Sequence, residues 1–224
     1  MQRSKINKII LEADAFIRGL GYALPPFADW PPERIRSAES TIIRDRGLGW
    51  DITDFGSNKF EETGLFLFTV RNGLLSDLNK GRGTLYAEKI MISRKEQVTP
   101  MHRHNLKAED IINRGGGDLV VQLFASSTRG QIHRWATLSV NVDGVKQTLP
   151  AGGKLLLKPG SSVTLLPYVW HSFWAGRADC MIGEVSTVND DNTDNIFDIP
   201  RARFAYIDED TEPQRLLVSG YWPF

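Results

Sequence analysis

Residues 99–117, TPMHRHNLKAEDIINRGGG, carry the most informative pattern in the sequence. It places His102 and His104 one residue apart, then Glu109, then three glycines at 115–117. In an extended segment, alternate side chains point to the same face, so both imidazoles point one way while Arg103 points away. The residues between His104 and Glu109 are enough for the backbone to turn and return a carboxylate from an adjacent strand. We therefore expect these three groups to converge.

A fourth converging group is His171, in LPYVWHSFWAG at 166–176, because it follows a turn and opens a strand in the second half of the chain. Three imidazole nitrogens and one carboxylate oxygen suit a divalent first-row metal. We expect one divalent ion, and these ligands suit manganese, cobalt, nickel, iron or zinc. Histidines are more often solvated or hydrogen-bonded core groups, and we keep that interpretation for His133, the fourth histidine of the chain.

The sequence from residue 64 onward predicts β-structure. Short apolar or alternating runs are bounded by turn residues: GLFLFTV, TLYAEKIMIS, DLVVQLFA, ATLSVNV, GKLLLKPG, SVTLLP, HSFWAG and CMIGEVSTV. Asp143-Gly144 between two valines predicts a tight hairpin, and Pro159-Gly160 predicts another turn. Many short strands at near-regular spacing predict a sandwich or barrel. No strand–helix alternation is present, which argues against a doubly wound sheet.

The N-terminal region has a different character. Apolar residues at helical spacing predict an amphipathic helix over 4–20, with Ser4 as its cap. The four prolines of PPFADWPP, residues 25–32, predict an irregular connector, and a weaker pattern indicates a second helix at about 32–46. We therefore expect one domain over 1–224, with a helical N-terminal extension at about 1–60.

Composition limits the class of partner and the compartment. Lys and Arg total 27, as do Asp and Glu, so the formal net charge is zero. A zero net charge argues against binding to nucleic acid or electrostatic binding to a membrane. The single cysteine, Cys180, excludes an internal disulfide and suits a reducing compartment. No signal-peptide core or membrane-spanning run is evident, so we expect a soluble cytoplasmic protein.

Two motifs carry a resemblance to the cupin superfamily. His102-x-His104-x4-Glu109-x6-Gly116 matches the first cupin motif in full, and residues 160–171 resemble a degraded second motif. Leu166 and Tyr168 stand where that motif usually has proline and glycine, so the turn before His171 is expected to differ in shape.

Longer strings make the resemblance more specific. GLGWDITDFG, LFTVRNG, YAEKIM, VTPMHRH, EDIINRGGG, HSFWAG and GEVSTVNDDNTDN together resemble the D-lyxose isomerases, from about residue 4 to the C-terminus. The resemblance implies a mainly β, cupin-type double-stranded β-helix (jelly-roll) barrel with N-terminal helices. It also implies a homodimer and a metal-dependent enzyme that interconverts D-lyxose and D-xylulose, with D-mannose and D-fructose as a further pair.

Such a reaction needs a Lewis acid and a group that moves a proton through an enediol. Glu184 lies in the apolar run CMIGEVSTV, where a carboxylate is costly unless it is paired or used. We take it as the candidate base, and the alternative is a buried salt bridge or an outward-facing side chain. Lys107 lies between His104 and Glu109, where its ammonium could stabilise enediolate charge. A solvated loop tip is the alternative for this lysine.

Four further charged residues are candidates for binding a polyol. Asp190, Asp194 and Arg203 follow Glu184 in a polar segment that could close over a sugar, and Lys89 lies on the strand leading to the histidines. Each of the four has a simple alternative as a surface charge.

Two other classes of function use the same ligands. A cupin dioxygenase could hold iron or nickel with three histidines and a glutamate, but it is expected to have a mostly apolar pocket. A non-catalytic cupin could bind a sugar as a sensor, although no helix-turn-helix or basic DNA-binding segment accompanies the barrel. The polar segment from Glu184 to Arg203 favours the isomerase.

Overall fold

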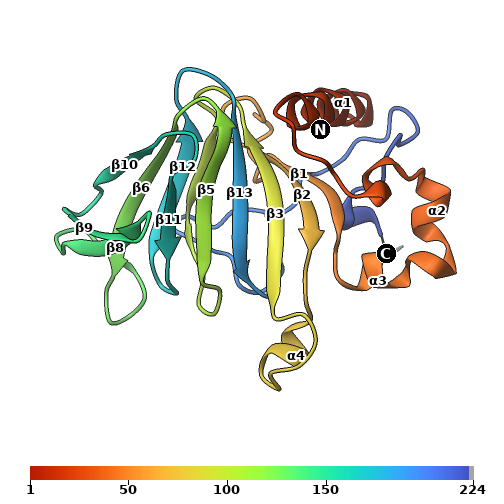
Figure 1. Cartoon of the computed structure of the whole chain (residues 1–224). Helices are drawn as coiled ribbons and strands as arrows, with labels where there is room; N and C mark the ends of the chain where they lie inside the picture. Colours follow the sequence, from red (N-terminus) through yellow and green to blue (C-terminus); the bar gives the residue numbers. More distant parts are fainter. Residues whose placement is uncertain (222–224) are drawn as a thin grey trace.

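The structure is a computed structural model that describes residues 1–221. Two antiparallel sheets curl and face each other, as Figure 1 shows. The order in the larger sheet is β1 (Gly49–Thr53), β2 (Leu65–Arg71), β3 (Tyr86–Ser93), β13 (Cys180–Thr187), β5 (Glu109–Gly116), β11 (Ser162–Leu165), β8 (Leu138–Val142) and β9 (Val145–Leu149). The order in the smaller is β10 (Lys154–Leu157), β6 (Leu119–Ser126), β12 (Trp170–Ala175), β4 (Val98–Arg103) and β14 (Ile196–Phe197), with β7 (Ile132–His133) pairing β6. This confirms the predicted jelly-roll barrel.

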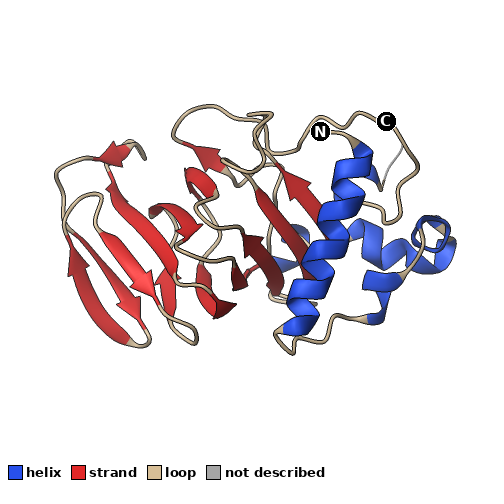
Figure 2. Cartoon of the chain, turned by 90° about the horizontal axis from the view of Figure 1, so that it is seen from above, coloured by secondary structure: helices blue, strands red, loops and turns tan. Residues whose placement is uncertain are grey.

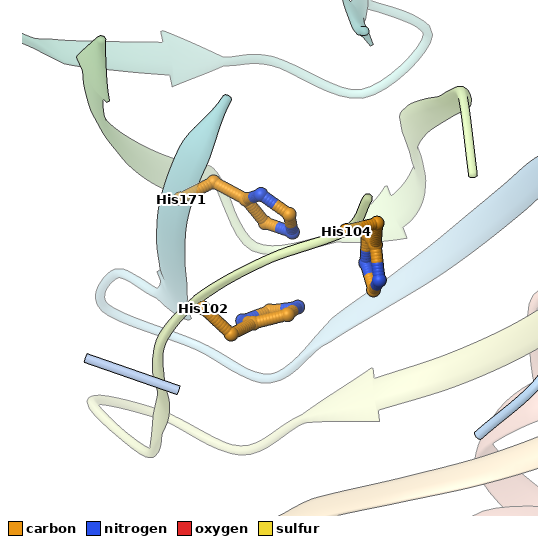
Figure 3. A group of neighbouring side chains, drawn as sticks. All are labelled: His102, His104 and His171. Carbon is orange, nitrogen blue, oxygen red and sulfur yellow. The ribbon is translucent and has the colours of Figure 1, made fainter. Parts of the chain in front are cut away.

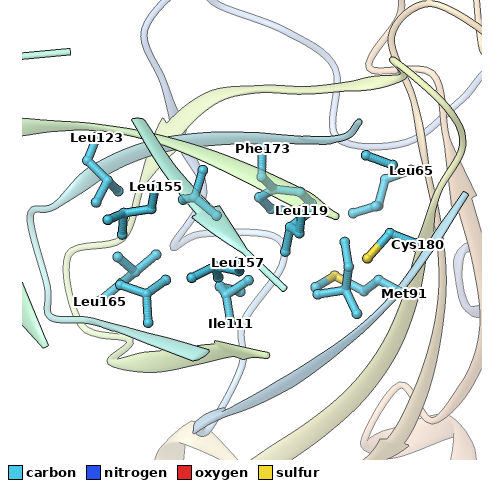
Figure 4. Close-up of a cluster of buried hydrophobic side chains, with 14 of the residues drawn as sticks. Leu65, Met91, Ile111, Leu119, Leu123, Leu155, Leu157, Leu165, Phe173 and Cys180 are labelled. Carbon is cyan, nitrogen blue, oxygen red and sulfur yellow. The ribbon is translucent and has the colours of Figure 1, made fainter. Parts of the chain in front are cut away.

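The barrel core lies between the two sheets. Figure 4 shows apolar side chains from both sheets meeting there, including Leu65, Ile111, Leu123, Leu157 and Phe173. Burying this apolar surface between the inner faces is the main force that closes the barrel.

Strands β2 and β3 are buried on both faces, which explains their nearly continuous apolar sequences. Leu67 and Met91 join the barrel core, whereas Phe68 and Ile90 join a second cluster on the outer face. That outer face is covered by α1 (Arg3–Gly19), and the helices gather on one side of the molecule in Figure 2. The N-terminal helices therefore complete the fold by covering one end of the larger sheet.

The helix predicted at 4–20 is confirmed, but Ser4 is not its cap. The helix starts one residue earlier, and the backbone nitrogen and Oγ of Ser4 bond the carboxylate of Asp210, at 2.8 and 2.6 Å. The predicted 32–46 helix is broken into α2 (Pro32–Arg36), η2 (Ala38–Ser40) and α3 (Thr41–Asp45). The break occurs because Ser37 is extended and its hydroxyl, like that of Ser40, bonds the carbonyl of Arg34.

The remaining elements are short: η1 (Pro26–Asp29), α4 (Leu75–Leu78) and η3 (Val218–Gly220). The predicted hairpin is present between β8 and β9, where Asp143 and Gly144 have φ of 50° and 80°. Both positive values match a type I′ turn. Strand β1 lies within the region expected to be helical, and its five residues are all buried. Within residues 1–221, no helix is both long and apolar enough to cross a membrane.

Candidate active site

Three histidines converge inside the barrel. His102 in β4 is paired across the sheet with His171 in β12, and His104 follows directly after β4. Figure 3 shows the three rings turned toward one another. One ring nitrogen from each residue lies within 4.8 Å of the other two. All three side chains are buried, so the predicted convergence of the imidazoles is confirmed.

Glu109 reaches this cluster from the opposite sheet. It is the first residue of β5, so the short connection after His104 carries the chain across the barrel. Its Oε1 lies 3.0 Å from Nε2 of His171 and 3.6 Å from Nε2 of His104. The carboxylate therefore faces the same point as the imidazoles.

The turn before His171 has Tyr168 in a left-handed backbone conformation. Tyr168 has φ of 67°, the left-handed conformation that glycine favours. Its backbone nitrogen donates to the carbonyl of His104 at 2.8 Å, and its carbonyl accepts from Ser126 Oγ. These two bonds hold the turn that leads into His171.

The other ring nitrogen of each histidine is held by a backbone carbonyl. Nδ1 of His102 lies 2.8 Å from the backbone carbonyl oxygen of Pro100. Nδ1 of His104 lies 2.6 Å from the backbone carbonyl oxygen of Asp194, and Nδ1 of His171 lies 3.0 Å from that of Val169. A carbonyl can only accept, so each Nδ1 carries the hydrogen. In a neutral ring, Nε2 is then left with a lone pair, which is the form that binds metals.

Electrostatics favour a cation between these groups. Burial lowers the pKa of His102 well below its usual value and also lowers that of His104, so both rings are neutral. Within the described chain, Nε2 of His104, Nε2 of His171 and Oε1 of Glu109 are buried without a hydrogen-bond partner. Lone pairs that face one another at these distances repel unless a positive ion lies among them. The residues therefore fit a divalent metal with nitrogen and oxygen ligands.

Beside the histidines lies a row of buried charges. Nζ of Lys107 is 2.7 Å from Oε2 of Glu109 and 2.9 Å from Oε1 of Glu184, whose same oxygen is 3.6 Å from Nζ of Lys89. Burial opposes all of these charges, but Lys107 and Lys89 hold the pKa of Glu184 below its ordinary value. Likewise, burial alone would lower the pKa of Lys107, and the two carboxylates raise it instead. Glu184 is thus a carboxylate and Lys107 an ammonium.

The row continues away from the histidines through Asp191 and Arg203. Nζ of Lys89 lies 3.4 Å from Asp191, whose other oxygen lies 2.9 Å from Nη2 of Arg203. The same Nη2 lies 3.0 Å from Asp51 in β1. Burial raises the pKa of Asp51, although Arg203 opposes the change. Charges therefore alternate in sign from Glu109 to Asp51.

The structure brings most of the sequence-predicted residues to one cavity. It is lined by the three histidines, Glu109, Lys89, Lys107, Glu184 and Arg203. Asp190 and Asp194 lie outside it. Asp190 accepts hydrogen bonds from the backbone of 192–193, and Asp194 accepts from the backbone nitrogens of 105–107.

The carboxylates of Asp190 and Asp194 thus shape loops, while Asp191 between them lines the cavity. Asp191 and Asp51 were missed by sequence reasoning. A polar loop gives no periodicity that tells its three aspartates apart, and Asp51 lies in a strand that was not predicted.

The chain is similar in sequence to known proteins. The sequence model of a family described as D-lyxose isomerase matches residues 1–221. A D-lyxose/D-mannose isomerase of Serratia proteamaculans is 45% identical over 229 aligned residues, covering 100% of this chain and 99% of the relative. One of the same description from Escherichia coli O157:H7 is 44% identical over 229 aligned residues and covers 100% of both chains.

Solved structures show the same fold at lower identity. The ligand-free L-ribose isomerase of Cellulomonas parahominis has a TM-score of 0.63 at 15% identity, covering 93% of this chain and 98% of its own. A variant of the L-ribose isomerase of Acinetobacter sp. DL28, in complex with L-ribose, has a TM-score of 0.62 at 14% identity with the same coverage.

Proposed function

We propose that this chain, which belongs to the D-lyxose isomerase family, interconverts D-lyxose and D-xylulose and also accepts D-mannose, giving D-fructose. The observation that carries the proposal is the row of buried, ionised groups that begins at the histidine cluster. The names of two full-length relatives support the substrate pair.

We assign the metal ligands as His102, His104, Glu109 and His171, with manganese as the first candidate. A divalent cation there would supply a Lewis acid that polarises the sugar carbonyl and the neighbouring hydroxyl. The Nδ1 hydrogen bonds to the backbone hold the three rings in place, and the carboxylate comes from the facing sheet.

Glu184 is the assigned base. Its carboxylate is buried and ionised, so it can accept the proton from one carbon and return it to the next. Lys107 lies 2.9 Å away and donates its hydrogens to oxygens that gain negative charge as the proton moves. Burial strengthens this interaction because little water competes with the ammonium.

Lys89 and Arg203 are the assigned substrate-binding residues. Both line the cavity, and Nη1 of Arg203 is buried without a partner among residues 1–221. A buried guanidinium hydrogen without an acceptor is costly, and a sugar hydroxyl would provide one. Asp191, rather than Asp190 or Asp194, is the aspartate that we assign to the binding site. Its carboxylate forms ion pairs with both Lys89 and Arg203.

The row of buried charges favours an isomerase over a dioxygenase, because an apolar substrate would displace water from these ions and offer no polar groups in its place. A protein that only senses a sugar needs no ionised base beside the metal ligands, so the buried carboxylate of Glu184 favours an enzyme over a sensor. We further propose a cytoplasmic homodimer without nucleic-acid or membrane partners, as the family resemblance and the zero net charge suggest.

The test is a set of assays on metal-depleted protein reconstituted separately with manganese, cobalt, nickel, zinc or iron. Each form is given D-lyxose, D-mannose, L-ribose and a phosphorylated aldose, and the ketose formed is measured. We expect turnover of D-lyxose and D-mannose that returns only with metal. Full activity without metal, or a much higher kcat/KM for L-ribose or a sugar phosphate, would contradict the proposal. Light scattering measures the oligomer in the same samples.

A further inference from the structure

The cavity is lined by apolar side chains and two threonines as well as by the charged groups and histidines. The apolar part of the lining consists of barrel-core side chains, among them Leu65, Met91, Ile111 and Phe173, which Figure 4 shows packed together. Thr99 of β4 is also part of this lining and is only 2% exposed.

An irregularity in β4 turns Thr99 toward the cavity. In the pairing of β12 with β4, His171 lies opposite His102 but Phe173 lies opposite Thr99. Two steps along β12 therefore match three steps along β4, which means that β4 carries one extra residue. Without it, residues 99 and 102 would face opposite sides of the sheet. Pro100 suits this position because it has no backbone hydrogen to pair.

The hydroxyl of Thr99 has no partner in the chain. Its Oγ1 is buried and makes no hydrogen bond to any described residue. Thr53, which lines the same cavity, is satisfied because its Oγ1 accepts from the backbone nitrogen of Phe55 at 2.9 Å. The nearby Ser172 hydroxyl donates to the carbonyl of Thr99, at 2.7 Å, rather than to its side chain.

A buried hydroxyl without a partner destabilises the folded protein. Valine would fill almost the same volume with no such cost. The missing partner is therefore expected to come from whatever occupies the cavity.

We propose that Thr99 is a substrate-binding residue, whose Oγ1 forms a hydrogen bond with a sugar hydroxyl beyond the two carbons that react. This inference rests on the proposed function. Thr99 lies opposite the core residue Phe173, about two residue steps or ~7 Å along the sheet from His102. Lys107 lies between Glu109 and Glu184, so we place the reacting carbons beside these groups and the far end of the sugar toward Thr99.

The test compares Thr99→Val, which keeps the shape and removes the hydroxyl, with Thr99→Ser, which keeps the hydroxyl. Thr148→Val is the matched control, because that hydroxyl bonds Ser139 on the β8–β9 hairpin, outside the cavity lining. Each protein is loaded with manganese. Metal content, unfolding in urea without sugar, binding of D-arabinitol by calorimetry and kcat/KM for D-lyxose are measured. D-arabinitol is reduced D-lyxose, so its binding reports on the hydroxyls without turnover.

For Thr99→Val we expect wild-type metal content, stability without sugar equal to or above wild type, and about tenfold weaker binding of D-arabinitol, the weight of one hydrogen bond. The kcat/KM for D-lyxose should fall by a similar factor. Thr99→Ser and Thr148→Val should stay within about twofold of wild type in both measurements.

Three results would overturn the inference: Thr99→Val binding D-arabinitol as tightly as wild type, Thr99→Ser losing as much as Thr99→Val, or Thr99→Val losing its metal. If the wild-type protein isomerises D-lyxose and Thr99→Val has the same kcat/KM and the same affinity for D-arabinitol, only the role of Thr99 is contradicted. A wild-type protein that neither binds D-arabinitol nor isomerises any aldose contradicts the proposed function and this role together.

Discussion

Replacing Glu184 by glutamine separates its proposed chemical role from its structural one. The amide has nearly the same shape but cannot accept a proton at neutral pH. Oε1 of Glu184 lies 2.9 Å from Nζ of Lys107 and 3.6 Å from Nζ of Lys89, so the change removes one negative charge from between two ammonium groups.

The fold should survive because each lysine keeps another partner. Lys107 retains Glu109 at 2.7 Å, and Lys89 retains the side-chain oxygen of Asn189 at 2.7 Å. Neither cation becomes an isolated buried charge, so the loss of about 3–5 kcal/mol typical of a fully broken buried pair does not apply. We expect a loss of about 1–3 kcal/mol in the free energy of unfolding, the range for hydrogen bonds to charged groups. Loss of a general base should lower kcat about 100-fold or more, which corresponds to ~2.7 kcal/mol in the barrier.

The assay measures D-xylulose formation from D-lyxose with the manganese-loaded protein, together with metal content and urea unfolding. Exchange of the C2 hydrogen with deuterated solvent is followed by NMR and should be lost along with isomerisation. Glu88→Gln is the matched control, since Glu88 is also in the larger sheet and is paired with Arg71, but is not part of the cavity lining. Near-normal kcat and exchange in Glu184→Gln, with metal retained, would refute the role of Glu184 and make Lys107 the next candidate.

Three further predictions follow from the site. His102→Ala or His104→Ala should lower metal content and isomerase activity together, and a variant that keeps both would remove that histidine from the ligand set. Stability of the metal-free protein, measured by urea unfolding from pH 8 to pH 5, should fall as the pH drops below 6.5, the ordinary pKa of histidine. Burial lowers the pKa of His102 and His104 in the folded state, so the unfolded chain binds protons at a higher pH than the native protein does. Proton binding therefore stabilises the unfolded state as the pH falls. A free energy of unfolding that does not change over this pH range would contradict the prediction. Asp51→Asn should raise KM for D-lyxose about tenfold with a smaller change in kcat, because Arg203 loses one of its two carboxylates; an unchanged KM would show that Asp51 has no part in binding.

Several features could be derived from local sequence because they depend on neighbouring residues. Alternation along a strand places His102 and His104 on one face, and the structure has them in one cluster. The Asp143-Gly144 hairpin depends on the positive φ that these two residues tolerate. The strands from residue 64 onward were predicted from their apolar runs, because burial against a core follows directly from side-chain type.

Other features depended on contacts between segments distant in the sequence. The sequence did not distinguish Asp191 from Asp190 and Asp194, because all three lie in one polar loop and only the packing of that loop against Lys89 and Arg203 selects one. It also gave no sign that Asp51 lies beside Arg203, more than 150 residues later.

Thr99 is the clearest case of a feature decided by tertiary structure. Strict alternation would place it on the face opposite His102, and one extra residue in β4 reverses that orientation. The bulge is defined by pairing with β12, about 70 residues away, and no local pattern encodes it. Local sequence therefore identified the histidines and the glutamate that we propose as metal ligands, whereas the pairing of distant strands decided which other side chains line the cavity.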